Sequence, residues 1–285
     1  MSASTGYRLV KLANGLFSVR SLAEHETFHP VVGPAAEADT LYVEQLDLKN
    51  RLRTSREHFV VWDVGLGAAA NAVAVLRNSE RIQCTLSIHS FDKTVEALRF
   101  ALGHAAQLGY FGDYEPVARE LLEQGCVTVS DGSRIAQWQL HLVDFPDFVT
   151  RPDTAVHIRP NAVLYDPFSP KNNPEMWTFN VFKSLFEVLD PGRPCALATY
   201  SRSTMLRVTL LLAGFYVGKG TPTGTKEETT IAANTLDLIR QPLDRRWLSR
   251  ALRSTSAEPL TAPVYRQAPL SRTTCERLLA HPQFR

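Results

Sequence analysis

Three aspartates follow predicted strands of this 285-residue chain, in the position where open α/β sheets bind their ligands. Asp63 ends the strand "HFVVWD", Asp92 ends "TLSIHSFD", and Asp144 follows "WQLHLV". A single acid in such a position is more often a helix N-cap or a surface carboxylate. Three at successive strand ends favour a ligand that is held along one edge of the sheet.

The loop after the first acid has the composition of a cofactor-binding turn. In "VVWDVGLGAAAN", Gly65 and Gly67 let the backbone approach a ligand, and small residues at 68–70 let the next helix pack closely. A dinucleotide site would need a third glycine where Ala70 stands, and Asp63 would repel a pyrophosphate. The same carboxylate suits a ligand with a positive amino end and no phosphate, which is the chemistry of S-adenosylmethionine.

The other two acids extend this site. Asp92 is placed to accept hydrogen bonds from ribose hydroxyls, as the acid of dinucleotide folds does, and Asp144 to accept one from an adenine amino group. The set therefore favours a methyltransferase.

A fourth acid, Asp166, begins the stiff segment "DPFSPKNNPEMW". The string "DPFSP" is akin to the Asp/Asn-Pro-Pro-aromatic loops of methyltransferases that act on amino nitrogens. A fixed carboxylate can hold the N–H bonds of an amine and direct its lone pair at the methyl carbon, while proline rings keep the loop from relaxing. The alternative is a proline-rich turn in which Asp166 caps a helix near Pro174.

Alternating strand and helix patterns must position these acids. A hairpin is expected around Asn14-Gly15, a helix over 35–51, and from residue 58 a mainly parallel, doubly wound sheet with helices on both faces. One later helix is expected to span "EMWTFNVFKSLFEVL". A hairpin turn at Asp131-Gly132 and a closing strand pair, "FYVGKG" and "ETTIAA", would give the sheet an antiparallel edge. We expect a lead-in segment over 1–52, a core over 53–233 and a basic, loop-rich extension over 234–285.

Composition limits which other kinds of site and partner the protein can have. The four cysteines are far apart and without metal spacing, which predicts reduced thiols and no metal site. The apolar runs are too short to span a bilayer and the N-terminus lacks a signal-peptide pattern, so we expect a cytoplasmic protein without a membrane partner. Residues 231–285 carry nine arginines and four acids, a local charge of +5 against +2 for the chain. Such a tail is compatible with phosphate contacts, for which solvated surface charge is the simpler interpretation. The candidates are Arg202, Arg207, Lys219, Lys226 and the arginines of the tail.

In order and spacing these motifs resemble the methyltransferase domain of the bifunctional tRNA 5-methylaminomethyl-2-thiouridine biosynthesis protein MnmC and its stand-alone relatives. The resemblance covers roughly residues 9–233 and includes "ETFHP", "GPAAEADTLYV" and "AVLYDPFSPKNNPEMW". It implies a class I methyltransferase fold that uses S-adenosylmethionine to methylate the aminomethyl nitrogen of a wobble uridine in tRNA. The anticodon region of tRNA is then the partner, and a monomer is favoured. No flavin domain is expected after residue 233.

The resemblance also implies roles for individual residues. Asp166 and Phe168 would line the methyl-transfer site. Cofactor contacts are assigned to the glycine loop, the ribose-side acid and the adenine-side acid: Asp63, Gly65, Gly67, Asn71, Asp92 and Asp144.

Several positions depart from the family pattern. Ala68 and Ala69 replace a Thr-Gly pair, aspartates stand at 63 and 92 where glutamates are common, and Pro167 replaces a glycine. Two alternatives therefore stay open. One is a methyltransferase for an adenine amino group or a small amine, and the other is a non-catalytic RNA-binding relative.

Overall fold

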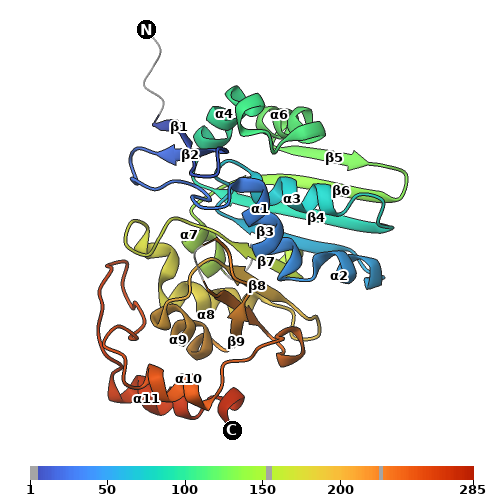
Figure 1. The fold of residues 1–285 in the computed structure, drawn as a ribbon. Coiled ribbons are helices and arrows are strands. Elements are labelled where there is room, and N and C mark those ends of the chain that lie inside the picture. The colour runs from blue at the N-terminus through green and yellow to red at the C-terminus, as the bar shows by residue number, and fades with distance from the viewer. Residues whose placement is uncertain (1–5, 152–155, 225–226) are drawn as a thin grey trace.

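The computed structural model describes residues 6–151, 156–224 and 227–285. Its centre is an eight-stranded sheet in the order β5-β6-β4-β3-β7-β8-β10-β9 (Figure 1). The five central strands run parallel, β5 pairs antiparallel with β6 at one edge, and β10 and β9 form the other edge antiparallel to β8. The strands in sheet order are Cys126–Ser130, Arg134–Leu142, Cys84–Asp92, Phe59–Val64, Ala162–Tyr165, Ala196–Thr199, Thr229–Ala233 and Tyr216–Gly220. The predicted doubly wound sheet and its antiparallel edge are thus confirmed.

Helices cover both faces of the sheet because the central strands are apolar on both sides. On β3, Val61 packs into one core cluster, while Val60, Trp62 and Val64 pack into the other, as the two-residue period of a strand requires. Helices of the first face are α1 (Pro34–Ala38), α2 (Leu48–Thr54), α3 (Ala70–Asn78), α4 (Glu96–Gly103), α5 (Ala105–Leu108) and α6 (Glu115–Gln124). Those of the second face are α7 (Phe145–Thr150), α8 (Phe179–Val188), α9 (Thr204–Ala213), α10 (Arg245–Ala251) and α11 (Arg272–Leu279).

The predicted single helix over 35–51 is wrong. The chain instead forms α1, a π-helical segment over Asp39–Glu44 and, after a left-handed residue at Asp47, α2. The π-helical segment buries three consecutive side chains, Leu41 to Val43. The carboxylate of Asp39 accepts hydrogen bonds from Arg77 and Asn78, so the segment is fastened to the end of α3.

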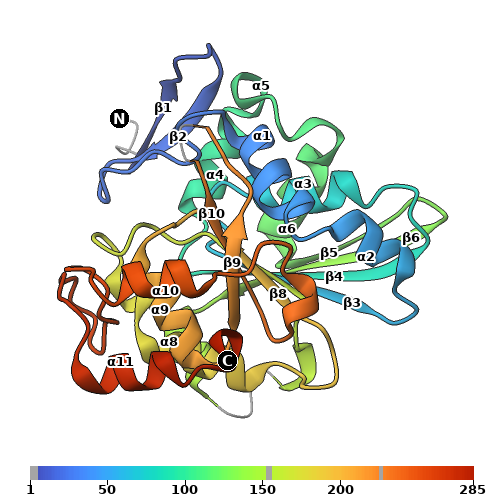
Figure 2. The same cartoon turned by 60° about the horizontal axis from the view of Figure 1, so that its bottom comes forward.

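The helix expected from Glu175 starts later than predicted. Residues Pro174–Trp177 form a single 3₁₀ turn, and α8 begins at Phe179, where the Thr178 hydroxyl accepts from the Val181 N–H as an N-cap. The extension after residue 233 contains α10 and α11, which the pattern did not indicate, joined by an irregular loop (Figure 2). Trp247, Leu248 and Leu278 of these helices are buried in the same core cluster as α8 and α9. The predicted boundaries at residues 53 and 234 stay predictions.

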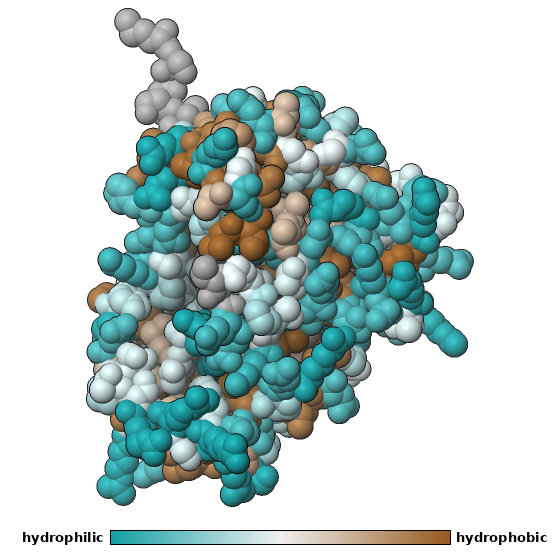
Figure 3. Space-filling view, viewed as in Figure 1, coloured by the Kyte–Doolittle hydropathy of each residue, from teal (hydrophilic) through white to brown (hydrophobic). Residues whose placement is uncertain are grey.

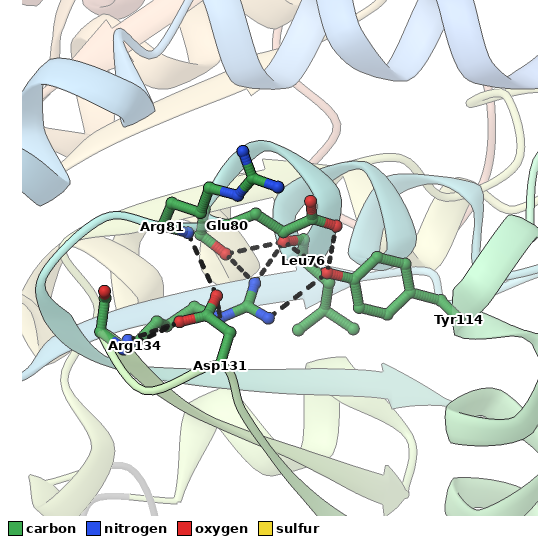
Figure 4. A network of polar contacts seen from close by, with 8 residues as sticks. Leu76, Glu80, Arg81, Tyr114, Asp131 and Arg134 are labelled. Carbon is green, nitrogen blue, oxygen red and sulfur yellow. Dashed lines mark hydrogen bonds and ion pairs between the residues drawn. The ribbon is translucent and has the colours of Figure 1, made fainter.

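A buried arginine joins the β5–β6 turn to the end of α3 (Figure 4). Arg134 donates to the Leu76 carbonyl, to Ser79 Oγ at 2.8 Å and to Tyr114 Oη at 3.3 Å. Tyr114 in turn donates to Glu80 at 2.7 Å, and three backbone N–H groups hold the pKa of Asp131 down to about 2. This network lies at the end of α3 opposite the glycine loop, so it anchors the helix whose first turn meets the predicted site.

Candidate functional site

A cavity of about 430 Å³ opens at the carboxyl ends of β3, β4 and β7. This volume lies within the usual range of small-molecule sites. Its wall includes the glycine loop after β3 (65–68), the end of β4 (91–94) and the segment after β7 (166–168). Part of the N-terminal segment (26–30) completes it. Of the predicted site residues, the wall contains Gly65, Gly67, Asn71, Asp92, Asp166 and Phe168.

The two glycines of the loop are required by backbone geometry. Gly65 has φ +92°, and a Cβ there would lie 2.8 Å from the carbonyl oxygen of Asp166. Gly67 has φ +50°, and a Cβ there would lie 3.3 Å from the ring of Phe28. Ala69, which stands where the family pattern has glycine, also adopts a left-handed conformation, with φ 64°. At the start of α3 the chain therefore places an alanine in a conformation that glycine adopts more easily.

Asp92 is held against the glycine loop. Its Oδ2 accepts from the Gly67 N–H at 3.0 Å, and its Oδ1 accepts from the Thr94 N–H at 3.2 Å. Burial raises the pKa of Asp92, and the bonds from backbone N–H groups oppose this effect. The carboxylate is thus fixed in the cavity wall in the position predicted for ribose recognition.

Asp166 lies at the end of β7 and meets the glycine loop from the other side. Its Oδ2 accepts from Asn71 Nδ2 at 2.8 Å, and the Nε2 of His29 lies 3.8 Å from the same oxygen. The hydroxyl of Tyr42 is buried nearby, and burial together with the charge of Asp166 raises its pKa well above the ordinary range. Asn71 Oδ1 is buried and has no hydrogen-bond partner in the described parts of the chain. A ligand with an N–H group at this point would satisfy it.

The segment after Asp166 is fixed by hydrogen bonds as well as by its prolines. Tyr200 Oη donates to the Pro167 carbonyl at 3.0 Å, and Trp177 Nε1 donates to the Phe168 carbonyl at 2.8 Å. Trp177 is fully buried, whereas Tyr200 also lines the cavity. The loop carrying the predicted catalytic acid is therefore tied to the core at both residues that follow the acid.

The N-terminal segment closes the cavity, and the individual roles of its residues were not predicted. After the hairpin of β1 (Tyr7–Lys11) and β2 (Phe17–Ser21), the chain folds back along β2, and the Phe28 N–H donates to the Val19 carbonyl at 2.8 Å. The Glu26 carboxylate accepts from the Ser169 N–H and from Asn172 Nδ2 across the cavity.

Aromatic and charged groups of this segment face Asp166. The ring of Phe28 lies 5.5 Å from that of Phe168. His29 lies between two acids, because its Nδ1 is 4.0 Å from Glu37 Oε2 while its Nε2 faces Asp166. The sequence signal for this segment was the string "ETFHP", which contributed to the family resemblance. It did not indicate which residues the segment would contact, so no individual role was assigned.

Two predicted cofactor residues lie outside the cavity wall. Asp63 is fully buried below it, accepting from Ser90 Oγ at 2.7 Å, and burial raises its pKa to about 7. Asp144 lies beyond β6 and forms an ion pair with Lys93 at 2.7 Å, next to Val143 and Phe145 of the wall. The structure thus brings six of the eight predicted residues together in the cavity wall. Asp63 lies behind the wall, and Asp144 lies beside it.

The predicted phosphate contact by Arg207 is wrong. Its side chain is 2% exposed and donates to Glu228 Oε1 at 2.8 Å and to the Thr229 carbonyl at 2.7 Å. Arg202 and Lys219 are exposed, and Lys226 lies outside the described residues.

Comparison with known proteins agrees with this geometry. Residues 117–235 match a family described as S-adenosyl-L-methionine-dependent methyltransferase. The chain is 30% identical over 223 residues to the tRNA 5-methylaminomethyl-2-thiouridine biosynthesis bifunctional protein MnmC of Azoarcus sp. strain BH72, covering 73% of the chain and 33% of that protein. It is 24% identical over 248 residues to the protein of the same name from Leptospira interrogans, covering 84% and 37%. The chain belongs to the S-adenosyl-L-methionine-dependent methyltransferases and is similar to the methyltransferase part of MnmC.

The similarity has defined limits. The chain spans about a third of the length of these relatives. The crystal structure titled MNMC2 from Aquifex aeolicus has a TM-score of 0.69 at 21% identity, covering 98% of this chain and 85% of that one, and it shows the class I methyltransferase fold. Across the ranges that the structure describes, no helix is long and apolar enough to cross a membrane. The same ranges contain no group of three His, Cys, Asp or Glu side chains arranged for a metal ion.

Proposed function

We propose that this methyltransferase acts on the aminomethyl nitrogen of 5-aminomethyluridine, with or without a 2-thio group, at the wobble position of tRNA. The observation that carries the proposal is the position of Asp166, a carboxylate in the cavity wall on a loop held at the two following residues. Both relatives described above are named for biosynthesis of a methylaminomethyl uridine in tRNA, which supports the same substrate.

The cofactor fits the donor set of the cavity. Asp92 is the acceptor proposed for the ribose hydroxyls, and Gly65 and Gly67 let the loop approach the Asp166 backbone and the Phe28 ring at the cavity wall. The free Oδ1 of Asn71 is an acceptor for the amino group of the methionine part. Asp144 would contact the adenine amino group at the rim. Asp63 would act on the ligand only from below, because it is fully buried outside the cavity wall.

Asp166 is proposed to position the amine. The bound cofactor supplies a methyl group made electrophilic by the positive sulfonium. Asp166 accepts an N–H bond of the substrate amine and so directs the nitrogen lone pair toward that methyl. As the new N–C bond forms, the nitrogen loses a proton, and Asp166 is the nearest base in this arrangement.

His29 and Glu37 are proposed to move that proton away. The imidazole Nε2 of His29 faces the Asp166 carboxylate, and its Nδ1 faces Glu37, so a positive imidazolium would lie between two acids. The apolar rings of Phe28 and Phe168 line this part of the cavity, and apolar walls strengthen electrostatic contacts between groups that they enclose.

The decisive experiment is incubation of the chain with labelled cofactor and tRNA from cells that lack the terminal methylase, followed by nucleoside mass spectrometry. The expected product is 5-methylaminomethyluridine, with or without the 2-thio group, at the expense of the aminomethyl nucleoside. Matched tRNA that lacks aminomethyluridine is the control. Label on an adenine amino group, or equal label on both tRNA samples, would contradict the proposal and favour another amino-directed methyltransferase.

A further inference from the structure

A second hollow, of about 740 Å³, lies beside the outer edge of the sheet, and half of its eight lining residues are cationic. Its basic residues are Lys219 on β9 and three arginines of the C-terminal extension, and its single acid is Asp244. We call Lys219, Arg246, Arg250 and Arg253 together with neighbouring Arg202 the basic strip. Figure 3 shows hydrophilic side chains gathered over the part of the molecule where α10 and α11 lie in Figure 1.

The fold directs the arginines of the C-terminal extension in this strip toward solvent. Residues 241–242 run along β9, since the Lys219 N–H donates to the Gln241 carbonyl at 2.9 Å. Helix α10 then starts with an Asp244 cap and buries Trp247 and Leu248 against the core. Burial of that face turns the arginines at 246, 250 and 253 to solvent, and all three are exposed.

The strip leads to the cavity that holds Asp166. Thr199 at the end of β8 pairs with Thr230 of β10, which pairs with Lys219 of β9, so Lys219 lies level with the end of β8. Tyr200 of the cavity wall follows directly, and Arg202 comes two residues later. Burial lowers the pKa of Arg207, the Glu228 carboxylate opposes this effect, and the charges of Arg202 and Arg250 add to it, so each of these two cations acts on Arg207.

Most of this positive charge has no internal partner. Glu228 forms ion pairs with Arg207 at 2.8 Å and with Lys219 at 3.4 Å. For Arg202, Arg246, Arg250 and Arg253, no carboxylate of residues 6–151, 156–224 or 227–285 lies within 4.0 Å. Arginine forks suit phosphate oxygens, and an elongated row of them suits a chain of phosphates better than a single anion.

We propose that the basic strip binds the phosphodiester backbone of the RNA whose base enters the cavity. This inference rests on the proposed function and adds the surface that the partner would contact. Backbone contacts position a nucleic acid without selecting its sequence. The strip would thus set the register of the anticodon stem while the cavity selects the nucleoside.

The test compares two triple variants by fluorescence anisotropy with labelled tRNA over a range of salt concentrations. Arg246→Gln/Arg250→Gln/Arg253→Gln removes three charges from the strip. The matched control, Arg53→Gln/Arg56→Gln/Arg81→Gln, removes three exposed charges near the amino ends of β3 and β4, the opposite edge of the sheet. The strip variant should lose about tenfold or more in affinity, and its slope of log Kd against log salt should fall by about two to three, whereas the control should keep both.

Two further measurements separate charge from folding and from catalysis. Arg246→Lys/Arg250→Lys/Arg253→Lys keeps the charge and should keep the salt slope within about one unit of the parent protein. In the methylation assay the Gln variant should raise KM for tRNA and leave the cofactor Kd unchanged. Equal affinity of strip and control variants, or a Lys variant as weak as the Gln variant, would overturn the inference. Absence of methyl transfer by the parent protein would instead refute the proposed substrate, and the binding comparison would still decide the role of the strip.

Discussion

Asp63 is a fully buried carboxyl group, and its ionisation should make the protein less stable as pH rises. Burial raises its pKa from 3.8 to about 7, while in the unfolded chain the group titrates near 3.8. Between these values the folded protein holds a proton that the unfolded chain has released. Stability is therefore greatest below the unfolded pKa and falls as pH rises, by about 1.4 kcal/mol per pH unit, until the folded pKa is passed.

The perturbation that reveals this effect is Asp63→Asn, which keeps the shape and the acceptor for Ser90 but cannot ionise. From about pH 5 to about pH 8 the parent protein should lose on the order of 3 kcal/mol more than the variant, from roughly two pH units of titration below the folded pKa. Chemical denaturation of both proteins at intermediate pH values measures the difference directly. The histidines are the same in both proteins, so their contribution to the pH dependence of stability cancels in this comparison.

The exposed Asp237→Asn serves as the matched control and should follow the parent curve at every pH. Parallel stability curves for the parent protein and Asp63→Asn would refute the reasoning, because they would mean that Asp63 is ionised or neutral alike in both states. Saturating cofactor should reduce the pH dependence of the parent protein if the positive amino end favours the charged carboxylate.

Three further outcomes test the site. Asp166→Ala should leave cofactor affinity near that of the parent protein and lower turnover by about a hundredfold, measured by calorimetry and methyl transfer, and unchanged turnover would remove Asp166 from the reaction. Gly65→Ala should lower the free energy of unfolding by about 1–3 kcal/mol because its Cβ meets the Asp166 carbonyl, whereas Gly103→Ala, with no atom within 4 Å of the added carbon, should not destabilise the protein. His29→Gln should lower kcat by about tenfold while cofactor affinity stays near that of the parent protein, and an unchanged kcat would exclude the proton-transfer role.

Much of the cavity wall could be predicted from local pattern alone. Gly65 and Gly67 follow a buried strand, and Asp92 and Asp166 follow two of its neighbours, so the carboxyl edge of a parallel sheet brings them together. Asn71 follows the loop on the first turn of the next helix. The alternation of strands and helices predicted a parallel sheet whose strand ends share one edge, and the structure supplies the strand order that makes these residues neighbours.

The closing segment could not be placed by such reasoning. Glu26 and Ser169 are 143 residues apart, and their contact depends on how the N-terminal hairpin lies over the sheet. No period in the sequence links them. The break in the helix over 35–51 has the same origin, because the π-helical turn buries Tyr42 toward Asp166, a contact between distant segments. Tertiary packing decided the local structure in both places.

The different positions of the four acids follow from the register of the strands. Asp63 pairs laterally with Ser90 of β4 and Leu164 of β7, one residue before β3 ends, so neighbours on both sides enclose it. Asp92 is the last residue of β4 and extends beyond the end of β3, and Asp166 follows the last residue of β7. Asp144 lies two residues beyond β6, where Lys93 holds it at the rim. A shift of one or two residues along a strand therefore separates a carboxylate in the cavity wall from one that is buried behind it or held at the rim, and assignment of strand ends from sequence does not resolve that shift.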